Sequence, residues 1–170
     1  AELSEIYDNI VPIMSEKAYS TDTRFGKARD FIDEIEALCG RSIIHTIAQA
    51  EPIGPKNLLD LLVIAPCTGN TLAKLAHGIT DSSVTMAAKA HLRNGKPLLI
   101  AVSTNDGLTG NAANLGLLLN RKNVYFVPFG QDDPHKKPGS LIADFRLIPQ
   151  AVESAFNGVQ IQPVLRFDIG

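Results

Sequence analysis

The stretch LLVIAPCTGNTLAKLAHGITD, residues 61–81, decides the fold. Its first five residues, Leu61 to Ala65, are all apolar and show no helical alternation, which is typical of a strand buried on both faces of a parallel sheet. A small polar turn follows at residues 66–71, and apolar residues then recur at helical spacing up to Gly78, a typical helix stop. A buried strand, a polar loop and a helix in this order form the ligand-binding corner of an open α/β sheet.

Length and composition predict a single domain over residues 1–170. With 20% charged residues and a net charge of −2, the chain has no basic excess that would favour nucleic acid or an anionic membrane. No apolar run approaches the roughly 20 residues of a spanning helix. Cys39 and Cys67 lack metal-ligand spacing and no signal peptide is visible, so we expect no metal site and a reducing, cytoplasmic location.

The chain begins at Ala1, without a methionine and already within a helical pattern. In folds of this kind the first strand and the turn after it usually help to bind the ligand. We therefore expect that a first strand precedes the printed sequence.

The remaining pattern alternates between strands and helices. Strands are expected at Ile10–Met14, Pro97–Val102 and Val124–Val127, with one more possible at Val159–Leu165. Helices are expected at residues 1–9, 28–38, 42–50, 82–93, 111–121 and 141–156, with Pro149 at a break or in a first turn. This alternation predicts a three-layer α/β fold of the flavodoxin-like or Rossmann-like type, with an open, mostly parallel sheet and helices on both faces.

Three polar loops follow predicted strands and should therefore meet at the carboxyl edge of the sheet. They are residues 66–71, 103–107 and 131–139. Thr68, Asn70 and Thr71 offer hydroxyls and an amide beside free N–H groups of a helix start, which suits a phosphate or a planar polar ring. A turn with helix caps and no ligand is the alternative, and the neighbouring Ser103–Asn105 loop favours a ligand.

Cationic side chains in two loops are candidates for holding carboxylates. Arg24 lies in a polar loop, and Lys136 and Lys137 lie between two prolines. Ordinary solvated surface residues are the alternative for all three. Lys74 is expected to be solvated, and Cys67 to be a buried packing residue.

Residues 63–81 resemble the flavin-binding segment of the homo-oligomeric flavin-containing cysteine decarboxylases. The resemblance implies bound FMN, a homo-oligomer and catalytic roles for Asn70 and Asn105. The cofactor-binding positions that it implies are Ser20, Pro66, Thr68, Gly69, Asn70, Thr71, Ser103 and Thr104. Asn105 is followed by Asp106-Gly107 where the decarboxylases carry a methionine-containing sequence, which disfavours a cysteine-containing substrate.

Five segments, in order, are also similar to the B-subunit family of bacterial spore dipicolinate synthases. These are STDTRFG (20–26), AEPIGPK (50–56), IAPCTGN (64–70), STNDGL (103–108) and PFGQDDPHKKP (128–138). This resemblance implies an oxidoreductase component that makes dipicolinate from dihydrodipicolinate in the mother cell, with a nicotinamide-binding A subunit using NADP. Arg24, Asn105, Lys136 and Lys137 would then bind the dicarboxylate.

Two alternatives stay open at this point. One is a flavin-dependent decarboxylase of a cysteine-containing substrate. The other is a non-catalytic component that stabilises the A subunit or channels its substrate.

Overall fold

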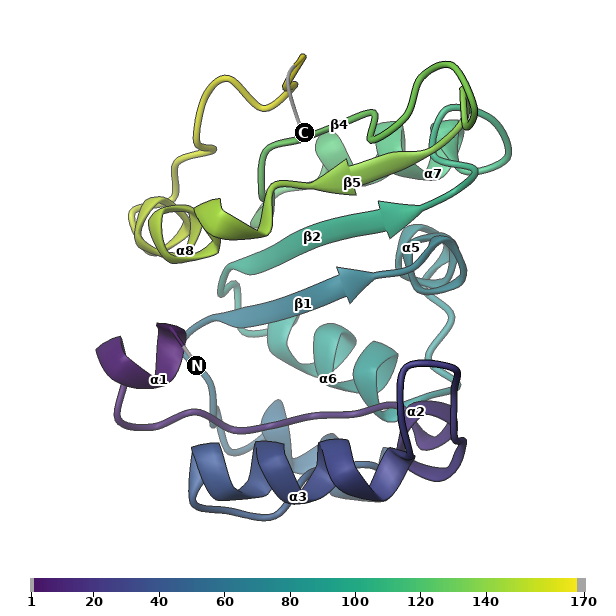
Figure 1. The fold of residues 1–170 in the computed structure, drawn as a ribbon. Coiled ribbons are helices and arrows are strands. Elements are labelled where there is room, and N and C mark those ends of the chain that lie inside the picture. Colours follow the sequence, from purple (N-terminus) through teal and green to yellow (C-terminus); the bar gives the residue numbers. More distant parts are fainter. Residues whose placement is uncertain (1, 168–170) are drawn as a thin grey trace.

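The computed structural model describes residues 2–167. Its five-stranded sheet has the order β1-β2-β5-β4, with β3 paired to the first half of β2 (Figure 1). The strands are β1 (Leu62–Cys67), β2 (Leu98–Thr104), β3 (Val124–Phe126), β4 (Phe129–Gly130) and β5 (Leu141–Ala143). β1, β2 and β3 run parallel, whereas β5 is antiparallel to β2 and to β4. The predicted mostly parallel sheet is confirmed.

Strand β2 is the centre of the hydrophobic core. Its residues Leu98 to Val102 are completely buried, so both faces of the sheet are covered at this strand. Full burial of one such leucine or isoleucine contributes about 1.5–3 kcal/mol. Phe126 and Phe129 extend the core towards β4, with ring centroids 5.8 Å apart.

Helices connect the strands, as the alternating pattern predicts. They are α1 (Glu2–Ile6), α2 (Glu16–Ser20), α3 (Ala28–Cys39), α4 (Ile47–Ala50), α5 (Gly69–His77), α6 (Ser83–Leu92), α7 (Ala112–Leu119) and α8 (Ile148–Phe156), with short 3-10 turns η1 (Glu51–Ile53) and η2 (Phe145–Leu147). Thr68 and Ser82 cap α5 and α6 at their starts, and Gly78, in the left-handed conformation with φ of 69°, ends α5. These caps fix where the loops at the sheet edge begin and end.

The N-terminal part of the chain lies beside the sheet without pairing to β1. After α1, the extended residues 9–14 run in the same direction as β1 (Figure 1). Their hydrogen bonds go to the other side: the Met14 N–H donates to Ile44 O, and the Ile44 N–H donates to Pro12 O, both at 2.9 Å.

Three expectations about secondary structure are wrong in part. In the predicted helix 42–50, Ile44 is extended and pairs with Ile13, and only residues 47–50 are helical, behind a capping box of Thr46 and Gln49. In the predicted helix 141–156, the first three residues form β5, because they complete the sheet beside β2. The predicted strand Val159–Leu165 is reduced to one bridge, between Phe129 and Leu165.

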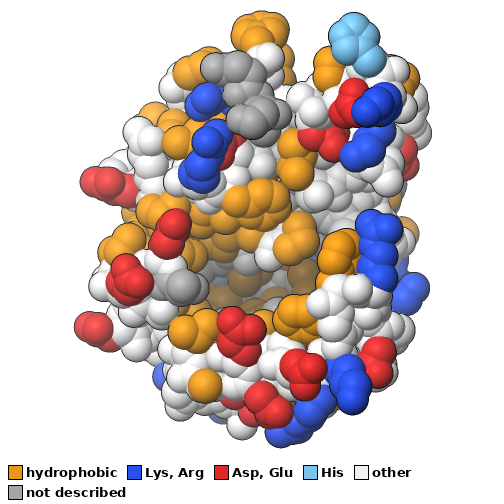
Figure 2. All heavy atoms as spheres, viewed as in Figure 1, with side chains coloured by type: hydrophobic (Ala, Val, Ile, Leu, Met, Phe, Trp, Pro, Cys, Tyr) orange, Lys and Arg blue, Asp and Glu red, His pale blue; other side chains and the backbone are white. Residues whose placement is uncertain are grey.

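Burial of β1 also differs from the prediction. Leu62 and Ile64 are buried, but Ala65 and Pro66 are exposed although they lie within the strand. One lateral edge of β1 pairs with β2, and the other borders a groove of about 470 Å³ (Figure 2), whose walls include Val11, Ile13 and Val63.

His91, on α6, predicts a pH-dependent stability. Its Nε2 donates to Pro97 O at 2.9 Å, and burial lowers the pKa of the side chain against the opposing effect of that bond. The unfolded imidazole takes up its proton near pH 6.5, and the buried one only at lower pH. We therefore expect the free energy of unfolding to fall as the pH drops below about 6.5.

Urea unfolding between pH 7.5 and 5 measures this slope. His91→Gln should flatten it, because the titrating group is gone. His77→Gln, at an exposed position of α5, is the matched control and should leave the slope unchanged. Equal slopes in the two variants would exclude His91 as the source.

Candidate functional site

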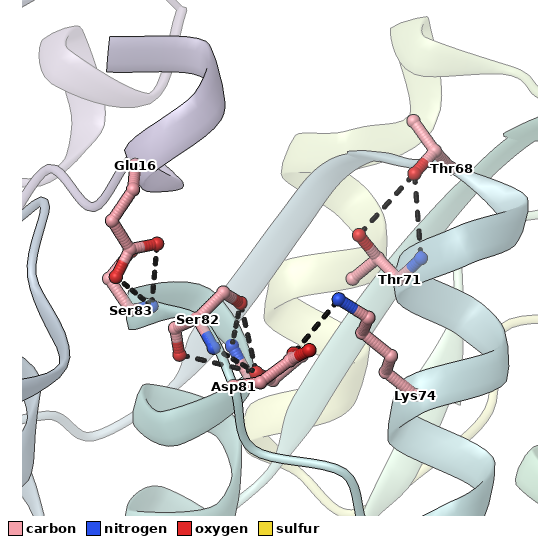
Figure 3. Close-up of polar contacts among 8 residues, drawn as sticks. Glu16, Thr68, Thr71, Lys74, Asp81, Ser82 and Ser83 are labelled. Carbon is pink, nitrogen blue, oxygen red and sulfur yellow. Dashed lines mark hydrogen bonds and ion pairs between the residues drawn. The ribbon is translucent and has the colours of Figure 1, made fainter. Parts of the chain in front are cut away.

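The start of α5 forms the middle of the predicted rim. Thr68 is the single residue between β1 and α5, and its hydroxyl accepts from the Thr71 N–H at 3.5 Å and lies 3.3 Å from the Thr71 hydroxyl (Figure 3). Asn70 is exposed beside them. Among residues 2–167 the Asn70 amide side chain has no hydrogen-bond partner, so it is available to a ligand. The predicted strand and helix start are present, but the predicted polar turn at residues 66–71 is reduced to Thr68, because Pro66 and Cys67 belong to β1 and residues 69–71 to α5.

Gly69 lets this helix start approach the loop after β2. A Cβ built on Gly69 would lie 2.5 Å from Thr104 Oγ1 and 2.7 Å from both Asp106 Oδ1 and Asn111 Nδ2. Real Cβ atoms do not come so close to polar atoms, so only glycine fits without a shift of the loop. The loops after β1 and β2 are therefore in direct contact.

Asp106 organises the second loop. Thr104 Oγ1 donates to one carboxylate oxygen at 2.5 Å, and Asn111 Nδ2 donates to the other at 2.8 Å. The Asp106 carbonyl also accepts the N–H groups of Thr109 and Asn111. The bond from Thr104 and then that from Asn111 hold the pKa of Asp106 below its usual range. The Thr104 hydroxyl is thus used within the protein, whereas the neighbouring Asn105 is exposed.

The third polar loop, residues 131–139, continues the same rim. The Leu108 N–H donates to Gly139 O at 2.9 Å and joins it to the second loop. Lys137 is paired with Asp132 at 3.0 Å, and Lys136 lies 4.0 Å from Asp133 with a largely exposed side chain. Both lysines face carboxylates of their own loop, and Lys136 is the more accessible of the two.

Ser20 and Arg24 lie away from these three loops. Ser20 is the last residue of α2, and its hydroxyl donates to Glu16 O at 2.8 Å. Arg24 lies over the exposed Phe25 ring, 4.7 Å from its centroid. In Figure 1 their segment is at the α2 end of the sheet edge, whereas the 131–139 loop is at the opposite end, with α5 between them.

A group of charged and capping residues separates α2 from α5 (Figure 3). Lys74 forms an ion pair with Asp81 at 2.8 Å, so the expectation of a solvated Lys74 is wrong. Both Glu16 carboxylate oxygens accept from the Ser83 N–H at 3.2 Å, and the Ser83 hydroxyl donates to Met14 O at 2.7 Å. These contacts hold α2 against the start of α6.

Cys67 has no nucleophilic role in this arrangement. It is completely buried, and burial raises the pKa of its thiol to about 12. The predicted packing role is confirmed. Within residues 2–167 there is no cluster of His, Cys, Asp or Glu that would hold a metal ion, and no helix is long and apolar enough to cross a membrane.

Sequence reasoning missed Asp106, Asn111 and Glu16 as organisers of the site. Asp106 lies within the predicted polar loop 103–107, and its place before Gly107 and five residues ahead of an asparagine was the available signal. Glu16 contacts Ser83 across 67 positions, and no local pattern predicts such a contact.

Comparisons with known proteins agree with this arrangement. Residues 8–128 match the family model described as Flavoprotein. The B subunit of dipicolinate synthase from Bacillus subtilis is 49% identical over 154 residues, which are 91% of this chain and 77% of that protein. The crystal structure of the corresponding B subunit from Bacillus halodurans superposes with a TM-score of 0.87 at 45% identity, over 95% of this chain and 83% of that one.

A more distant solved structure extends the comparison. A dodecameric FMN-dependent UbiX-like decarboxylase from Escherichia coli O157:H7 has a TM-score of 0.55 and 25% identity, and covers 74% of this chain and 68% of that chain.

Proposed function

This chain belongs to the flavoprotein family, and from that premise we propose that it binds FMN at the rim formed by the loops after β1 and β2. We further propose that, as a homologue of the B subunit of dipicolinate synthase, it takes part in the oxidation of dihydrodipicolinate to dipicolinate. A nicotinamide-binding A subunit would be its partner, in the mother cell of a sporulating bacterium. The FMN-dependent decarboxylase that shares the fold supports the cofactor.

The observation that carries the proposal is the close contact between Gly69 and the Asp106 loop. This contact brings the start of α5, which carries Thr68, Asn70 and Thr71, against the loop to which Asn105 belongs. N–H groups of a helix start, hydroxyls and amides match the alternating donors and acceptors of a flavin ring edge and the oxygens of its phosphate. The residues therefore fit the group.

Each residue would have a distinct part. Thr68, Thr71 and the N–H groups of α5 would hold FMN, which when bound supplies a two-electron acceptor. Asn70 would orient the ring, and Asn105, exposed on the neighbouring loop, would hold the substrate. Pro66, Ser103 and Thr104 would shape the wall of the site and would not donate to the ligand, since the Thr104 hydroxyl already donates to Asp106.

The substrate carries two carboxylates, which need cationic partners. Lys136 is the first candidate, because its loop is joined to the Asn105 loop and its side chain is largely exposed. Arg24 is the second candidate, from the opposite end of the edge. Lys137 forms an ion pair with Asp132 and would therefore stabilise the conformation of the 131–139 loop.

The reaction removes two hydrogens from the dihydropyridine ring. One leaves as a hydride equivalent, whose two electrons end on NADP of the A subunit, and the other leaves as a proton, so that the ring becomes aromatic. The present chain would bind and orient the flat dianion at the rim. A homo-oligomer is part of the proposal, and the dodecameric relative supports it.

Replacing Asn70 with alanine is the direct test of the cofactor site. The variant should bind FMN about tenfold more weakly, which corresponds to one lost hydrogen bond. Its stability should not fall, because alanine is the better helix former. Fluorescence titration of full-length protein with FMN measures the affinity, and Asn120→Ala, at the exposed end of α7, is the control.

Unchanged affinity in Asn70→Ala would remove this residue from the site. Full-length protein that neither contains nor takes up FMN would refute the cofactor proposal.

Assays of the nicotinamide-binding partner alone, this chain alone and their mixture test the catalytic part. We expect only the mixture to reach full activity. If the partner alone matches the mixture, this chain has no catalytic role. In the mixture, Lys136→Ala should raise KM for the dicarboxylate, and Lys122→Ala, outside the three loops, should not.

A further inference from the structure

We propose that Lys74 is the counter-ion of the FMN phosphate and that it leaves Asp81 for the phosphate when the cofactor binds. The inference rests on the cofactor site proposed above at the start of α5. Lys74 lies on α5, and its Nζ is 2.8 Å from Oδ1 of Asp81, the residue just before the cap of α6. Cofactor binding would thus exchange one anionic partner of Lys74 for another.

Lys74 lies on the same side of α5 as the proposed ligand groups. Asn70 and Thr71 precede it by four and three residues, so the three side chains are neighbours on the helix surface. The Cα–Cβ bonds of a helix tilt towards its N-terminus. Figure 3 shows the Lys74 side chain extending back towards the start of α5 and across to Asp81. Its ammonium group therefore points to the end of the helix where Thr68 and Thr71 would hold the phosphate.

The start of α5 needs a cation, because a carboxylate already stands against it. A Cβ on Gly69, the first residue of α5, would lie 2.7 Å from Asp106 Oδ1. Asp106 accepts from the neutral side chains of Thr104 and Asn111, and within residues 2–167 no lysine or arginine forms an ion pair with it. A phosphate monoester carries about −1.5 to −2 charge at pH 7, so Asp106 would repel it unless a cation compensates.

The cations considered so far have other places along the edge. Arg24 lies over the Phe25 ring at the α2 end, and Lys136 and Lys137 belong to the loop at the opposite end (Figure 1). Lys136 is the candidate for the dicarboxylate. Lys74 is the lysine that α5 itself carries, one turn from the proposed phosphate position.

The exchange of partners costs little. The Asp81 side chain is 56% exposed, so its ion pair with Lys74 is weakened by water and Asp81 can be hydrated when the lysine leaves. A phosphate at the helix start carries more charge than a carboxylate and is also held by free N–H groups. Lys74 therefore interacts more strongly with the phosphate than with Asp81.

A purely structural ion pair is the alternative. In that case Lys74 and Asp81 would only hold the connection between α5 and α6, and removal of either side chain would loosen the site and weaken FMN binding. The counter-ion role predicts opposite effects for the two residues. Loss of Lys74 removes the positive charge from the phosphate, whereas loss of the Asp81 charge frees Lys74 for it.

Fluorescence titrations of the full-length protein with FMN and with riboflavin test the proposal. Lys74→Met should bind FMN about tenfold more weakly and riboflavin unchanged, because riboflavin has no phosphate. Lys74→Arg keeps the charge and should stay within about threefold of wild type for FMN. Asp81→Asn should bind FMN about two- to fivefold more tightly. Lys89→Met, at an exposed position in the last turn of α6, is the control and should change neither affinity.

Several results would overturn the proposal. Equal FMN affinity in Lys74→Met and wild type would exclude the counter-ion role and leave the cofactor site standing. Weaker FMN binding in Asp81→Asn, or an equal loss of riboflavin affinity in Lys74→Met, would make the ion pair structural. Wild-type protein that binds no FMN would refute the cofactor site and this inference together. Thermal unfolding shows that each variant is folded, and Asp81→Asn, which retains Lys74, decides the matter if Lys74→Met does not fold.

Discussion

Replacing Gly69 with alanine is expected to destabilise the protein by about 1–3 kcal/mol, in spite of its position in a helix. The added methyl would meet Thr104, Asp106 and Asn111 at 2.5 to 2.7 Å. All three belong to one hydrogen-bonded loop, which would have to move as a unit. Because Asn105 lies in this loop, FMN affinity should fall together with stability.

Gly116→Ala is the matched control for this substitution. Gly116 lies within α7, and a Cβ there meets nothing within 4 Å. The same change should therefore stabilise the protein by up to about 1 kcal/mol through helix propensity alone. Thermal unfolding of both variants gives the comparison. If Gly69→Ala were as stable as Gly116→Ala, the inference that Gly69 is in tight contact with the loop after β2 would be wrong.

Asp106→Ala should have an effect of similar size. It removes two hydrogen bonds to a carboxylate and leaves Thr104 and Asn111 without their acceptor, at a cost of about 1–3 kcal/mol. Asp33→Ala is the control, because that aspartate also accepts a side-chain hydrogen bond, from Arg29, but in an exposed pair. Such exposed pairs contribute little, so we expect no measurable loss from the control.

The pH dependence of Asp106 has a definite sign. Its folded pKa is lowered by the bonds from Thr104 and Asn111, whereas the unfolded carboxyl titrates near pH 3.9. The contribution of the Asp106 carboxylate to the free energy of unfolding is therefore complete above about pH 4. It is lost as the pH falls through the lower pKa of the folded state. The stability difference between wild type and Asp106→Asn, measured by urea unfolding, should shrink only in that acidic range. A difference that already shrinks between pH 7 and 5 would point to another group.

The sheet and its edge could be predicted from the sequence because their signals are local. Leu98 to Val102 form an unbroken apolar run, and Thr68 and Ser82 are standard helix caps, so strands, helices and the three loops follow from neighbouring residues. The same reasoning failed at Ile44, where helical spacing was real but pairing with Ile13 decided the outcome. Long-range pairing overrides a local pattern when it satisfies the backbone.

The location of the candidate site could be predicted from the sequence, but the pairing of its side chains could not. The residue types in the three loops predict that polar groups gather at one edge. They do not predict that the Thr104 hydroxyl donates a hydrogen bond to Asp106. Nor do they predict the ion pairs of Lys137 with Asp132 and of Lys74 with Asp81. Each of these pairings depends on side-chain directions, which residue spacing does not determine. Prediction of which polar groups remain for a ligand therefore required the structure.

The Glu16 carboxylate has a consequence for anion selectivity. Two helix starts, those of α5 and α6, open at this edge of the sheet, and each would attract a phosphate. At α6 that place is already taken by Glu16, which accepts from the Ser83 N–H. An incoming phosphate there would meet a like charge and would have to displace it. The α5 start carries the neutral Thr68 hydroxyl in the corresponding place, so we expect a phosphate monoester to prefer α5 over the adjacent α6.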